Sequence, residues 1–310
     1  MISVFIDGGA GTTGIDIAQR LGNRKDITLI TLDEAKRKDE DARRDALHAA
    51  DFAILCLPDA AARDAVALAD GSSVRIIDAS SAHRTAPGWI YGFAEMAAGQ
   101  RATIAGAARV SNPGCYATGF IALIAPLVAR GLIPADGHYS CNAVSGYSGG
   151  GKALIERMEN AEPDIAWRSY ALGLDHKHVP EMQVQCGLAH APLFSPAVVP
   201  AYRAMVVEVP LMRAQNARIA PMDELRAALL DHYENSIGIA IGGLANNGEI
   251  LLRSHAEPSD RMTLDLFASA DGQQVRLVAS LDNLGKGAGG ACVQNLNIMA
   301  GLPESAGLRL

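Results

Sequence analysis

The sequence is poor in aromatic residues and lacks a cationic block. Aromatic residues make up 5% of the 310 positions, charged residues make up 20%, and the net charge is −7. A general nucleic-acid-binding protein needs a basic face, so we expect no nucleic-acid partner. Apolar residues reach 49%, which is enough for a buried core and excludes a disordered or fibrous chain.

Long apolar runs and paired cysteines are also missing. The longest apolar run, residues 116–129, is shorter than the roughly 20 residues that span a bilayer, and it contains Pro126. The start of the sequence has no basic stretch followed by a cleavage site, as a secretory signal would have. The five cysteines show no CxxC spacing, which argues against a disulfide framework or a zinc ribbon. We therefore expect no membrane partner and a reducing compartment, the cytoplasm.

The first hundred residues alternate short β-branched runs with helix-forming segments. Strands are predicted at residues 4–6, 27–32, 52–57, 74–78 and 102–105, and helices at 12–21, 39–50 and 59–70. Strand–helix alternation requires right-handed crossovers, which produce a parallel sheet with helices on both faces. The fold class predicted for this part is therefore α/β, of the Rossmann type.

The middle of the sequence has a different pattern. Longer strand-like runs occupy residues 138–145, 197–210, 261–268 and 274–281, and one clear helix, 221–233, interrupts them. This pattern predicts an α+β domain with a mainly antiparallel sheet. The stretch 287–300 is again helical. We expect a first domain formed by residues 1–114 and 284–310, and a second domain formed by 115–283.

A glycine-rich turn follows the first predicted strand and opens the first helix. It comprises Gly8, Gly9, Gly11, Thr12, Thr13 and Gly14. Such glycines let backbone N–H groups approach a pyrophosphate at the positive end of a helix. A glycine pattern alone is a weak signal, but the strand before it and the helix after it favour a dinucleotide.

The second predicted strand ends in a mixed-charge segment. Asp33 is placed where a carboxylate would accept the ribose 2′-hydroxyl of NAD. The adjacent cations Lys36, Arg37 and Lys38 suit a 2′-phosphate instead. We favour NADP, with Arg37 or Lys36 on the phosphate.

Cys115 is the best candidate for a nucleophile. It follows a Pro-Gly turn and begins a helical run, where the helix dipole and free N–H groups stabilise a thiolate. The other four cysteines lie inside apolar or mixed runs and are interpreted as small buried residues. A thiolate nucleophile needs a group that handles protons, and His176 and His178 lie two apart beside Glu181. A metal site is the weaker alternative, because the pair has no further nearby ligand.

At this point the sequence resembles the N-acetyl-γ-glutamyl-phosphate reductases of arginine biosynthesis, in their shorter (type 2) branch. The resemblance runs along nearly the whole chain, and its most specific motifs are NPGCY at 112–116 and HKHVPE at 176–181. Ala94 stands where the longer branch tends to have proline. The remaining matching segments are 8–14, 56–59, 77–84, 89–95, 144–152, 282–291 and 294–295.

The resemblance implies a reaction and a set of site residues. NADPH would lie on the glycine turn, and Cys115 would attack an acyl phosphate to form a thioester, which hydride transfer reduces to an aldehyde. His178 is the preferred acid–base, with His176 the alternative. Further cofactor contacts are expected from Pro58, Asn283, Lys286 and Gly287. Substrate contacts are expected from Arg84, Arg109, Asn112, Ser145, Gly146 and Ser148.

Two other classes remain open. One is a related acyl-phosphate reductase, such as aspartate-semialdehyde dehydrogenase or a lysine-pathway enzyme with a carrier-linked substrate. The other is a dinucleotide-binding sensor without catalysis, which is disfavoured because both Cys115 and the histidine pair are present. We expect a small-molecule partner only, no metal, and a homodimer or homotetramer.

Overall fold

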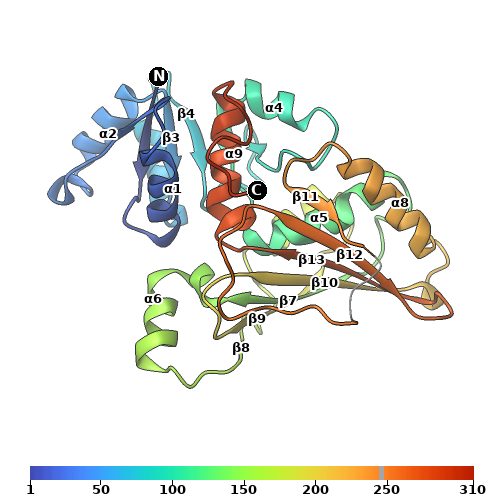
Figure 1. Ribbon diagram of the computed structural model, residues 1–310. Coiled ribbons are helices and arrows are strands. Elements are labelled where there is room, and N and C mark those ends of the chain that lie inside the picture. The colour runs from blue at the N-terminus through green and yellow to red at the C-terminus, as the bar shows by residue number, and fades with distance from the viewer. Residues whose placement is uncertain (244–247) are drawn as a thin grey trace. The chain divides into compact units, whose positions relative to one another are not determined.

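The computed structural model describes residues 1–243 and 248–310, which form two compact units (Figure 1). The first unit contains residues 1–94, 98–114 and 288–309, and the second contains 95–97, 115–287 and 310. The second unit is therefore inserted between two parts of the first. No helix in the described ranges is both long enough and apolar enough to cross a bilayer.

The first unit is built on a six-stranded sheet in which every pair of neighbours is parallel. The sheet order is β2-β1-β3-β4-β6-β5. Its strands are β1 (Ile2–Asp7), β2 (Ile27–Ile30), β3 (Phe52–Leu55), β4 (Arg75–Asp78), β5 (Ile90–Tyr91) and β6 (Arg109–Ser111). Its helices are α1 (Thr12–Gly22), α2 (Glu40–Ala49), α3 (Asp59–Leu68), α4 (Gln100–Gly106) and α9 (Gly290–Met299).

Alternation along the strands explains why both faces of this sheet are covered. Val4 and Ile54 belong to one core cluster, whereas their neighbours Phe5 and Leu55 belong to another. The first cluster includes side chains of α1, α4 and α9, and the second includes side chains of α2 and α3. The chain passes from β1 to β2 on one side and then to β3 on the other. Such a reversal leaves a crevice at the carboxyl ends of the strands, where α/β proteins bind ligands.

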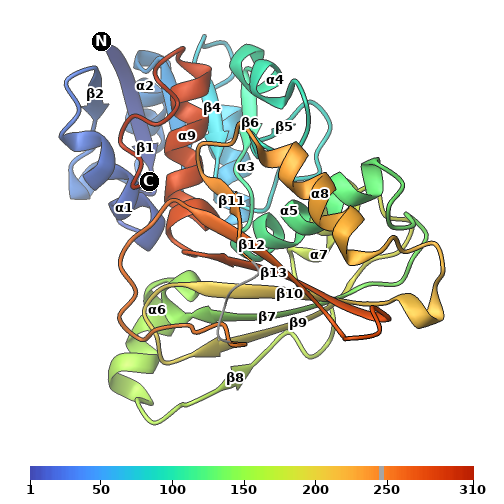
Figure 2. The ribbon, with the colours of Figure 1, turned by 45° about the vertical axis from the view of Figure 1, so that its right-hand side comes forward.

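The second unit contains a seven-stranded mixed sheet, in which four of the six neighbouring pairs are antiparallel (Figure 2). The sheet order is β11-β12-β13-β10-β7-β9-β8. Its strands are β7 (Ser140–Gly146), β8 (Arg168–Ser169), β9 (Leu193–Val199), β10 (Met205–Met212), β11 (Ile239–Ile241), β12 (Met262–Ala268) and β13 (Gln274–Leu281). Its helices are α5 (Cys115–Ala129), α6 (Gly151–Glu156), α7 (Val179–Gln185) and α8 (Met222–Tyr233). The predicted fold class is therefore confirmed.

Several predicted elements need correction. Residues 102–105 form part of helix α4 rather than a strand, because Ile104 packs into the core as a single buried position among helix-forming residues. The predicted strand 197–210 is two strands, β9 and β10, separated by a turn that contains Pro200 and the positive-φ residue Ala204. The short strand β5 and the helices α6 and α7 had not been predicted.

Candidate functional site

The glycine-rich turn joins β1 to α1 in the first unit. Gly8 has φ +86°, and the amide of Gly11 donates to its carbonyl at 3.0 Å. A Cβ at Gly8 would lie 2.3 Å from the carbonyl oxygen of Cys56, and one at Gly14 would lie 2.6 Å from that of Gly8. Only glycine fits at these two positions, because the obstructing atoms are backbone. Thr12 and Thr13 begin α1, so the first amides of the helix and its positive dipole end adjoin the turn.

A cavity of about 780 Å³ opens beside this turn. Its wall includes Gly8, Gly9 and Asp7. Asp7 is buried, and Arg43 donates to one of its carboxylate oxygens at 2.8 and 3.0 Å. The guanidinium of Arg43 therefore neutralises the charge of the one buried carboxylate in the cavity wall. The remaining lining residues are Phe5, Ile6, Ala10, Ala18, Leu29, Ile30, Thr31, Leu32, Glu34, Ala35, Arg37, Lys38 and Leu57.

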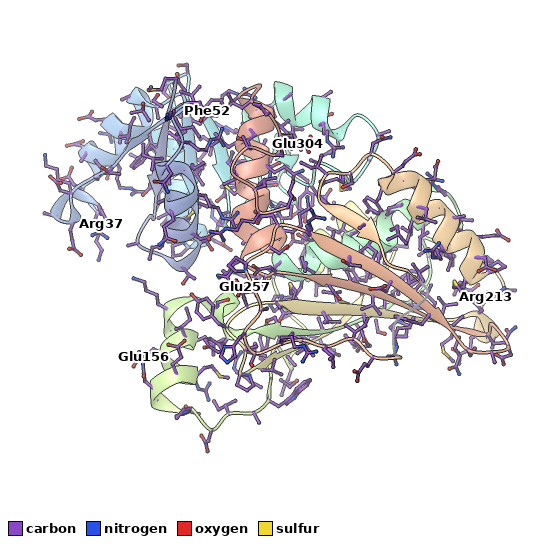
Figure 3. All side chains as sticks on the ribbon, in the orientation of Figure 1. Arg37, Phe52, Glu156, Arg213, Glu257 and Glu304 are labelled. Carbon is purple, nitrogen blue, oxygen red and sulfur yellow. The ribbon has the colours of Figure 1, made fainter. Side chains whose placement is uncertain are left out.

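The cationic segment after β2 contributes two of its three cations to the cavity. Arg37 and Lys38 line the cavity, whereas Lys36 and Asp33 are exposed outside its wall. Arg37 lies on the loop between β2 and α2 (Figure 3) and forms an exposed ion pair with Glu34 at 3.2 Å. Arg37 and Lys38 are therefore the cations of this segment that face the cavity, and the phosphate contact of Arg37 or Lys36 stays a prediction. Pro58 precedes α3 and also lies outside the cavity wall.

The two arginines predicted to contact the substrate, Arg84 and Arg109, both belong to the first unit but have different surroundings. Arg84 is buried and donates to the carbonyls of Asn112 (3.1 Å) and Ala79 (3.3 Å). Arg109 begins β6 and lies 3.5 Å from the exposed carboxylate of Asp70. Ligands of parallel sheets bind at the carboxyl ends of the strands, whereas Arg109 lies at the amino end of β6, and its substrate contact stays a prediction.

Asn112 is also engaged within the first unit. Its side-chain Nδ2 donates to the backbone carbonyl of Ala288 at 3.0 Å, and its side-chain Oδ1 accepts from Nδ2 of Asn295 at 3.0 Å. Its backbone N–H donates to Asp78 at 2.7 Å. Asn112 therefore orders the segment that precedes Cys115, and a direct substrate contact is not supported.

Cys115 is the first residue of α5, in the second unit. Its side chain is half-buried, whereas the next twelve residues of the helix are all buried. A Cβ at Gly287 would lie 2.8 Å from the Cβ of Cys115, so the backbone of the π-helical turn Gly285–Gly289 passes directly against the cysteine. Any side chain at Gly287 would push against Cys115, which explains why glycine is needed at this position.

The two predicted histidines lie together in the same unit. Their ring centroids are 4.7 Å apart, and both rings approach Tyr116, the neighbour of Cys115, at 6.2 Å (His176) and 5.9 Å (His178). The backbone N–H of His178 donates to Nδ1 of His176 at 3.1 Å, which fixes Nδ1 of His176 as an acceptor. Nε2 of His178 lies 3.9 Å from the buried carboxylate of Glu181. This carboxylate is near enough to stabilise His178 in its protonated form.

Two phenols, the buried Tyr116 and the half-buried Tyr170, complete the surroundings of Cys115. The hydroxyl of Tyr116 lies 2.7 Å from Oγ of Ser145 and 3.2 Å from the carbonyl of Ala197, and it also hydrogen-bonds to Tyr170. Burial raises the pKa of Tyr116 well above its ordinary value and that of Tyr170 to about 12, and the nearby Cys115 thiolate raises both further. Both phenols therefore stay protonated at neutral pH and act as neutral hydrogen-bonding groups. The hydroxyl of Ser145 contacts that of Tyr116, and its predicted contact with the substrate stays a prediction.

The other predicted residues of the second unit form internal contacts. Ser148 accepts a hydrogen bond from Nδ2 of Asn283 at 2.9 Å, and both side chains are buried. Oδ1 of Asn283 has no hydrogen-bond partner among the described residues. A Cβ at Gly146 would lie 2.6 Å from the carbonyl oxygen of Ala201, so this glycine serves close backbone packing.

Lys286 had been predicted to contact the cofactor. The structure instead buries it and pairs its Nζ with both carboxylate oxygens of Glu95, at 2.8 Å each. Glu95 is buried as well, so the two charges form a buried ion pair inside the second unit. The ion pair gives Lys286 a structural role, and its contact with the cofactor stays a prediction.

Sequence reasoning missed Tyr170 and Arg168. Arg168 lies in β8, with its guanidinium carbon 4.6 Å from the centre of the Tyr170 ring. The sequence carries no signal for either residue, because a strand of two residues is too short to show a periodic pattern. The turn from Tyr170 toward His176 is also hidden, because its positive-φ residues, Ala171 and Leu174, are not glycine. No group of three or more metal-ligating side chains occurs in the described part of the chain.

Comparisons with known proteins agree with this architecture. Residues 3–104 match the family described as semialdehyde dehydrogenase, NAD binding domain, and residues 115–283 match semialdehyde dehydrogenase, dimerisation domain. Aspartate semialdehyde dehydrogenases from Francisella tularensis (TM-score 0.72, 13% identity, covering 97% of this chain and 100% of that one) and Vibrio cholerae (0.70, 17%, 97% and 98%) share the fold.

Two curated relatives are much more similar in sequence. N-acetyl-gamma-glutamyl-phosphate reductase 2 of Nostoc sp. is 46% identical over 317 residues, covering 98% of each chain. N-acetyl-gamma-glutamyl-phosphate reductase of Brucella ovis is 49% identical over 306 residues, covering 96% of this chain and 98% of the relative. The chain therefore belongs to the semialdehyde dehydrogenase family and, within it, to the N-acetyl-γ-glutamyl-phosphate reductases.

Proposed function

We propose that this protein catalyses the NADPH-dependent reduction of N-acetyl-γ-glutamyl phosphate to N-acetyl-L-glutamate 5-semialdehyde and phosphate, a step of arginine biosynthesis. The observation that carries the proposal is the setting of Cys115. A half-buried cysteine at the first residue of a helix, with two histidines gathered around the adjacent tyrosine, has the composition of a thiol nucleophile with a proton-handling partner. The names of the relatives support the choice of substrate.

The first unit, in this proposal, is the dinucleotide-binding domain. The turn at Gly8 and Gly14 is packed so closely against backbone that only glycine fits at either position, and the adjoining cavity has a lining suited to an adenosine moiety and its phosphates. Arg37 and Lys38 would hold the 2′-phosphate of NADP. Asn283 belongs to the second unit; its Oδ1, buried without a partner among the described residues, would accept a hydrogen bond from the carboxamide of the nicotinamide. NADPH, when bound, supplies the hydride that reduces the thioester.

The second unit carries the covalent chemistry. The thiolate of Cys115 attacks the acyl carbonyl carbon, and the carbon–oxygen bond to phosphate breaks with its electron pair leaving on phosphate. After reduction of the thioester, the carbon–sulfur bond of the thiohemiacetal breaks, which returns the thiolate and releases the aldehyde. Covalent attachment keeps the acyl group away from water between the two steps.

We assign the acid–base role to His178. It would take the proton from Cys115 as the thiolate attacks, donate it to the oxygen formed when the thioester is reduced, and accept it again from that oxygen as the carbon–sulfur bond of the thiohemiacetal breaks. Glu181, 3.9 Å away, stabilises the protonated imidazole. His176 is the alternative, although its Nδ1 already accepts the backbone N–H of His178. Exchanging each histidine for asparagine and comparing single-turnover acylation would distinguish them, with the larger loss expected for His178.

Substrate anchoring and assembly follow from the remaining groups. Arg84, buried and held by two backbone carbonyls, would contact the substrate phosphate.

The dimerisation domain of the family supports an oligomer, and we infer a homodimer or a homotetramer. All five cysteines are free thiols, which suits the reducing cytoplasm.

The reverse reaction tests the function directly. Purified protein is mixed with N-acetylglutamate semialdehyde, phosphate and NADP, and formation of the reduced cofactor is followed by absorbance. Phosphate-dependent turnover with this aldehyde, and little with aspartate semialdehyde, is the expected result. Turnover with aspartate semialdehyde alone would contradict the proposed substrate, and no turnover with either aldehyde would contradict the proposed catalysis.

A further inference from the structure

Arg168 differs from the other arginines of the second unit. Its side chain is half-buried, and its guanidinium has no carboxylate or hydrogen-bond acceptor among the described residues. The other half-buried arginines of this unit are held by such acceptors: Arg203 by Asp282, and Arg213 and Arg226 by backbone carbonyls. A partly desolvated cation without an acceptor is unfavourable unless a ligand supplies the anion.

The contacts of Arg168 lead toward Cys115. Its guanidinium lies over the ring of Tyr170, 4.6 Å from the centroid, which is the geometry of a cation–π contact. The hydroxyl of Tyr170 hydrogen-bonds to that of Tyr116, the neighbour of Cys115. The ring of Tyr170 also meets the edge of His176, with centroids 5.6 Å apart. Arg168 is thus tied through the Tyr170 side chain to His176 and to Tyr116, the neighbour of the nucleophile.

Strand pairing holds this arrangement in place. β8 is antiparallel to β9, with Arg168 opposite Val198 and Ser169 opposite Ala197. The carbonyl of Ala197 in turn accepts from Tyr116 at 3.2 Å. Because side chains alternate along a strand, Arg168 and Tyr170 project from the same face of the sheet. The cation is therefore presented on a strand paired with β9, which itself contacts the cysteine-bearing helix through Ala197, rather than on a loose loop.

We propose that Arg168 binds the α-carboxylate of the substrate and so determines specificity for an amino-acid-derived aldehyde or acyl phosphate. This inference rests on the proposed function, which places an acyl phosphate at Cys115. The substrate carries a phosphate on the reacting carbon and a carboxylate four bonds away. Arg168 is separated from the cysteine by Tyr170 and Tyr116, which suits the remote anion, and guanidinium groups bind carboxylates in a bidentate manner.

The test compares two aldehydes that differ only in the carboxylate. The reverse reaction is measured with N-acetylglutamate semialdehyde and with 4-acetamidobutanal, its analogue without the carboxylate, for wild type, Arg168→Met and Arg168→Lys. The control variant is Arg130→Met, which removes an exposed arginine paired with Asp231 just beyond the last residue of α5. That position is about 22 Å along the helix from Cys115, at 1.5 Å per residue.

We expect Arg168→Met to raise KM for N-acetylglutamate semialdehyde about 100-fold, as expected for loss of a charge-assisted bidentate contact. In the same variant, KM for 4-acetamidobutanal and kcat for both aldehydes should change less than about threefold. Arg168→Lys should recover part of the lost affinity for N-acetylglutamate semialdehyde. Arg130→Met should behave as wild type. A fall in kcat with both aldehydes would overturn the proposal in favour of a role in positioning Tyr170.

Two other outcomes would also overturn it. A rise in KM for inorganic phosphate instead of the aldehyde would assign Arg168 to the phosphate, and an unchanged aldehyde KM would remove it from the site. Each of these results presupposes turnover by the wild type. An inactive wild type would instead contradict the proposed function itself, and with it the assignment of Arg168.

Discussion

The five cysteines differ more in their surroundings than in their sequence neighbours. Cys141, Cys186 and Cys292 are buried, and burial raises the pKa of each thiol well above its ordinary range. Cys56 is half-buried, and burial followed by the carboxylates of Asp78 and Asp7 raises its pKa to about 12. A raised pKa keeps a thiol in its neutral, unreactive form, so these four cysteines are unsuited to nucleophilic attack.

This contrast predicts selective alkylation. At pH 7.5, where the thiolate fraction of a group with a pKa near 12 is roughly one part in 10⁴ or less, iodoacetamide should modify Cys115 alone. Mass spectrometry of tryptic peptides measures the adduct, and labelling of Cys56 should begin only as the pH approaches 12. Cys115→Ser should abolish turnover and the adduct while retaining NADPH binding, whereas Cys186→Ser should stay active. Equal labelling of Cys56 at pH 7.5 would contradict the assignment.

At this scale the sequence predicts residues whose chemistry is local, and it misses those that depend on tertiary contacts. Cys115 at a helix start and the His176–His178 pair are legible because neighbouring residues define them. The ion pair between Lys286 and Glu95 was not predicted because the two residues are 191 positions apart in the chain. Arg168 was missed because its role depends on a ring contact at the edge of a sheet.

Among the elements, the turn between β1 and α1 offers a matched pair of substitutions on one helix. A Cβ at Gly14 would meet backbone atoms of Gly8 at 2.6 Å and Gly9 at 2.8 Å, whereas a Cβ at Gly22 would meet nothing within 4 Å. Gly14→Ala should distort the turn, raise KM for NADPH about 10-fold or more and lower Tm. Gly22→Ala should leave KM unchanged and stabilise α1 by up to about 1 kcal/mol, because alanine favours helix.

Steady-state kinetics and thermal unfolding of the two variants provide the measurements. If Gly14→Ala bound NADPH as tightly as Gly22→Ala does, the turn would not be the cofactor cradle. A loss of affinity in Gly22→Ala would show instead that any change in α1 perturbs the site.

The loop between β2 and α2 is the second element with a testable role. Replacing Arg37 and Lys38, which line the cavity, with alanine should raise KM for NADPH about 10-fold while KM for NADH changes little, because only NADPH carries the 2′-phosphate. Lys36→Ala, outside the cavity wall, is the control and should leave the ratio unchanged. Equal effects on both cofactors would place the 2′-phosphate contact elsewhere.

Periodicity predicted most elements but could not separate a short strand from a short helix. The segment 102–105 is helical because Ile104 alone is buried there, on the face that packs toward α9. The run 197–210 looks continuous in sequence, yet Ala204 adopts φ +79° and the chain reverses into an antiparallel course. Such reversals depend on pairing partners that lie elsewhere in the chain.

At the scale of the whole molecule, the chain enters the second unit three times, at 95–97, at 115–287 and at Leu310. The short segment 95–97 belongs to this unit although the residues on both sides of it belong to the first. The segment is held by two contacts. Lys286 pairs with the carboxylate of Glu95, and the ring of His232 in α8 hydrogen-bonds to the carbonyl of Glu95 at 2.9 Å. Composition and local pattern give no sign of this excursion, because its contacts lie far along the sequence.

The buried ion pair predicts a large and specific loss of stability. Glu95→Gln keeps the size of the side chain but leaves the buried ammonium of Lys286 without its carboxylate, which costs about 3–5 kcal/mol. For a unit of this size, that loss corresponds to a fall in Tm of about 10 °C. Glu40→Gln, which removes an exposed partner of Arg44, should change stability by less than about 1 kcal/mol.

Scanning calorimetry of both variants measures the difference, and a double variant separates the possible causes. Adding Lys286→Met to Glu95→Gln removes the uncompensated charge, so it should restore most of the lost stability even though the ion pair is absent. A double variant as unstable as Glu95→Gln would show that the Glu95 carboxylate acts through other neighbours. Equal and small effects of Glu95→Gln and Glu40→Gln would mean that water reaches Lys286, and that the pair is not buried in solution.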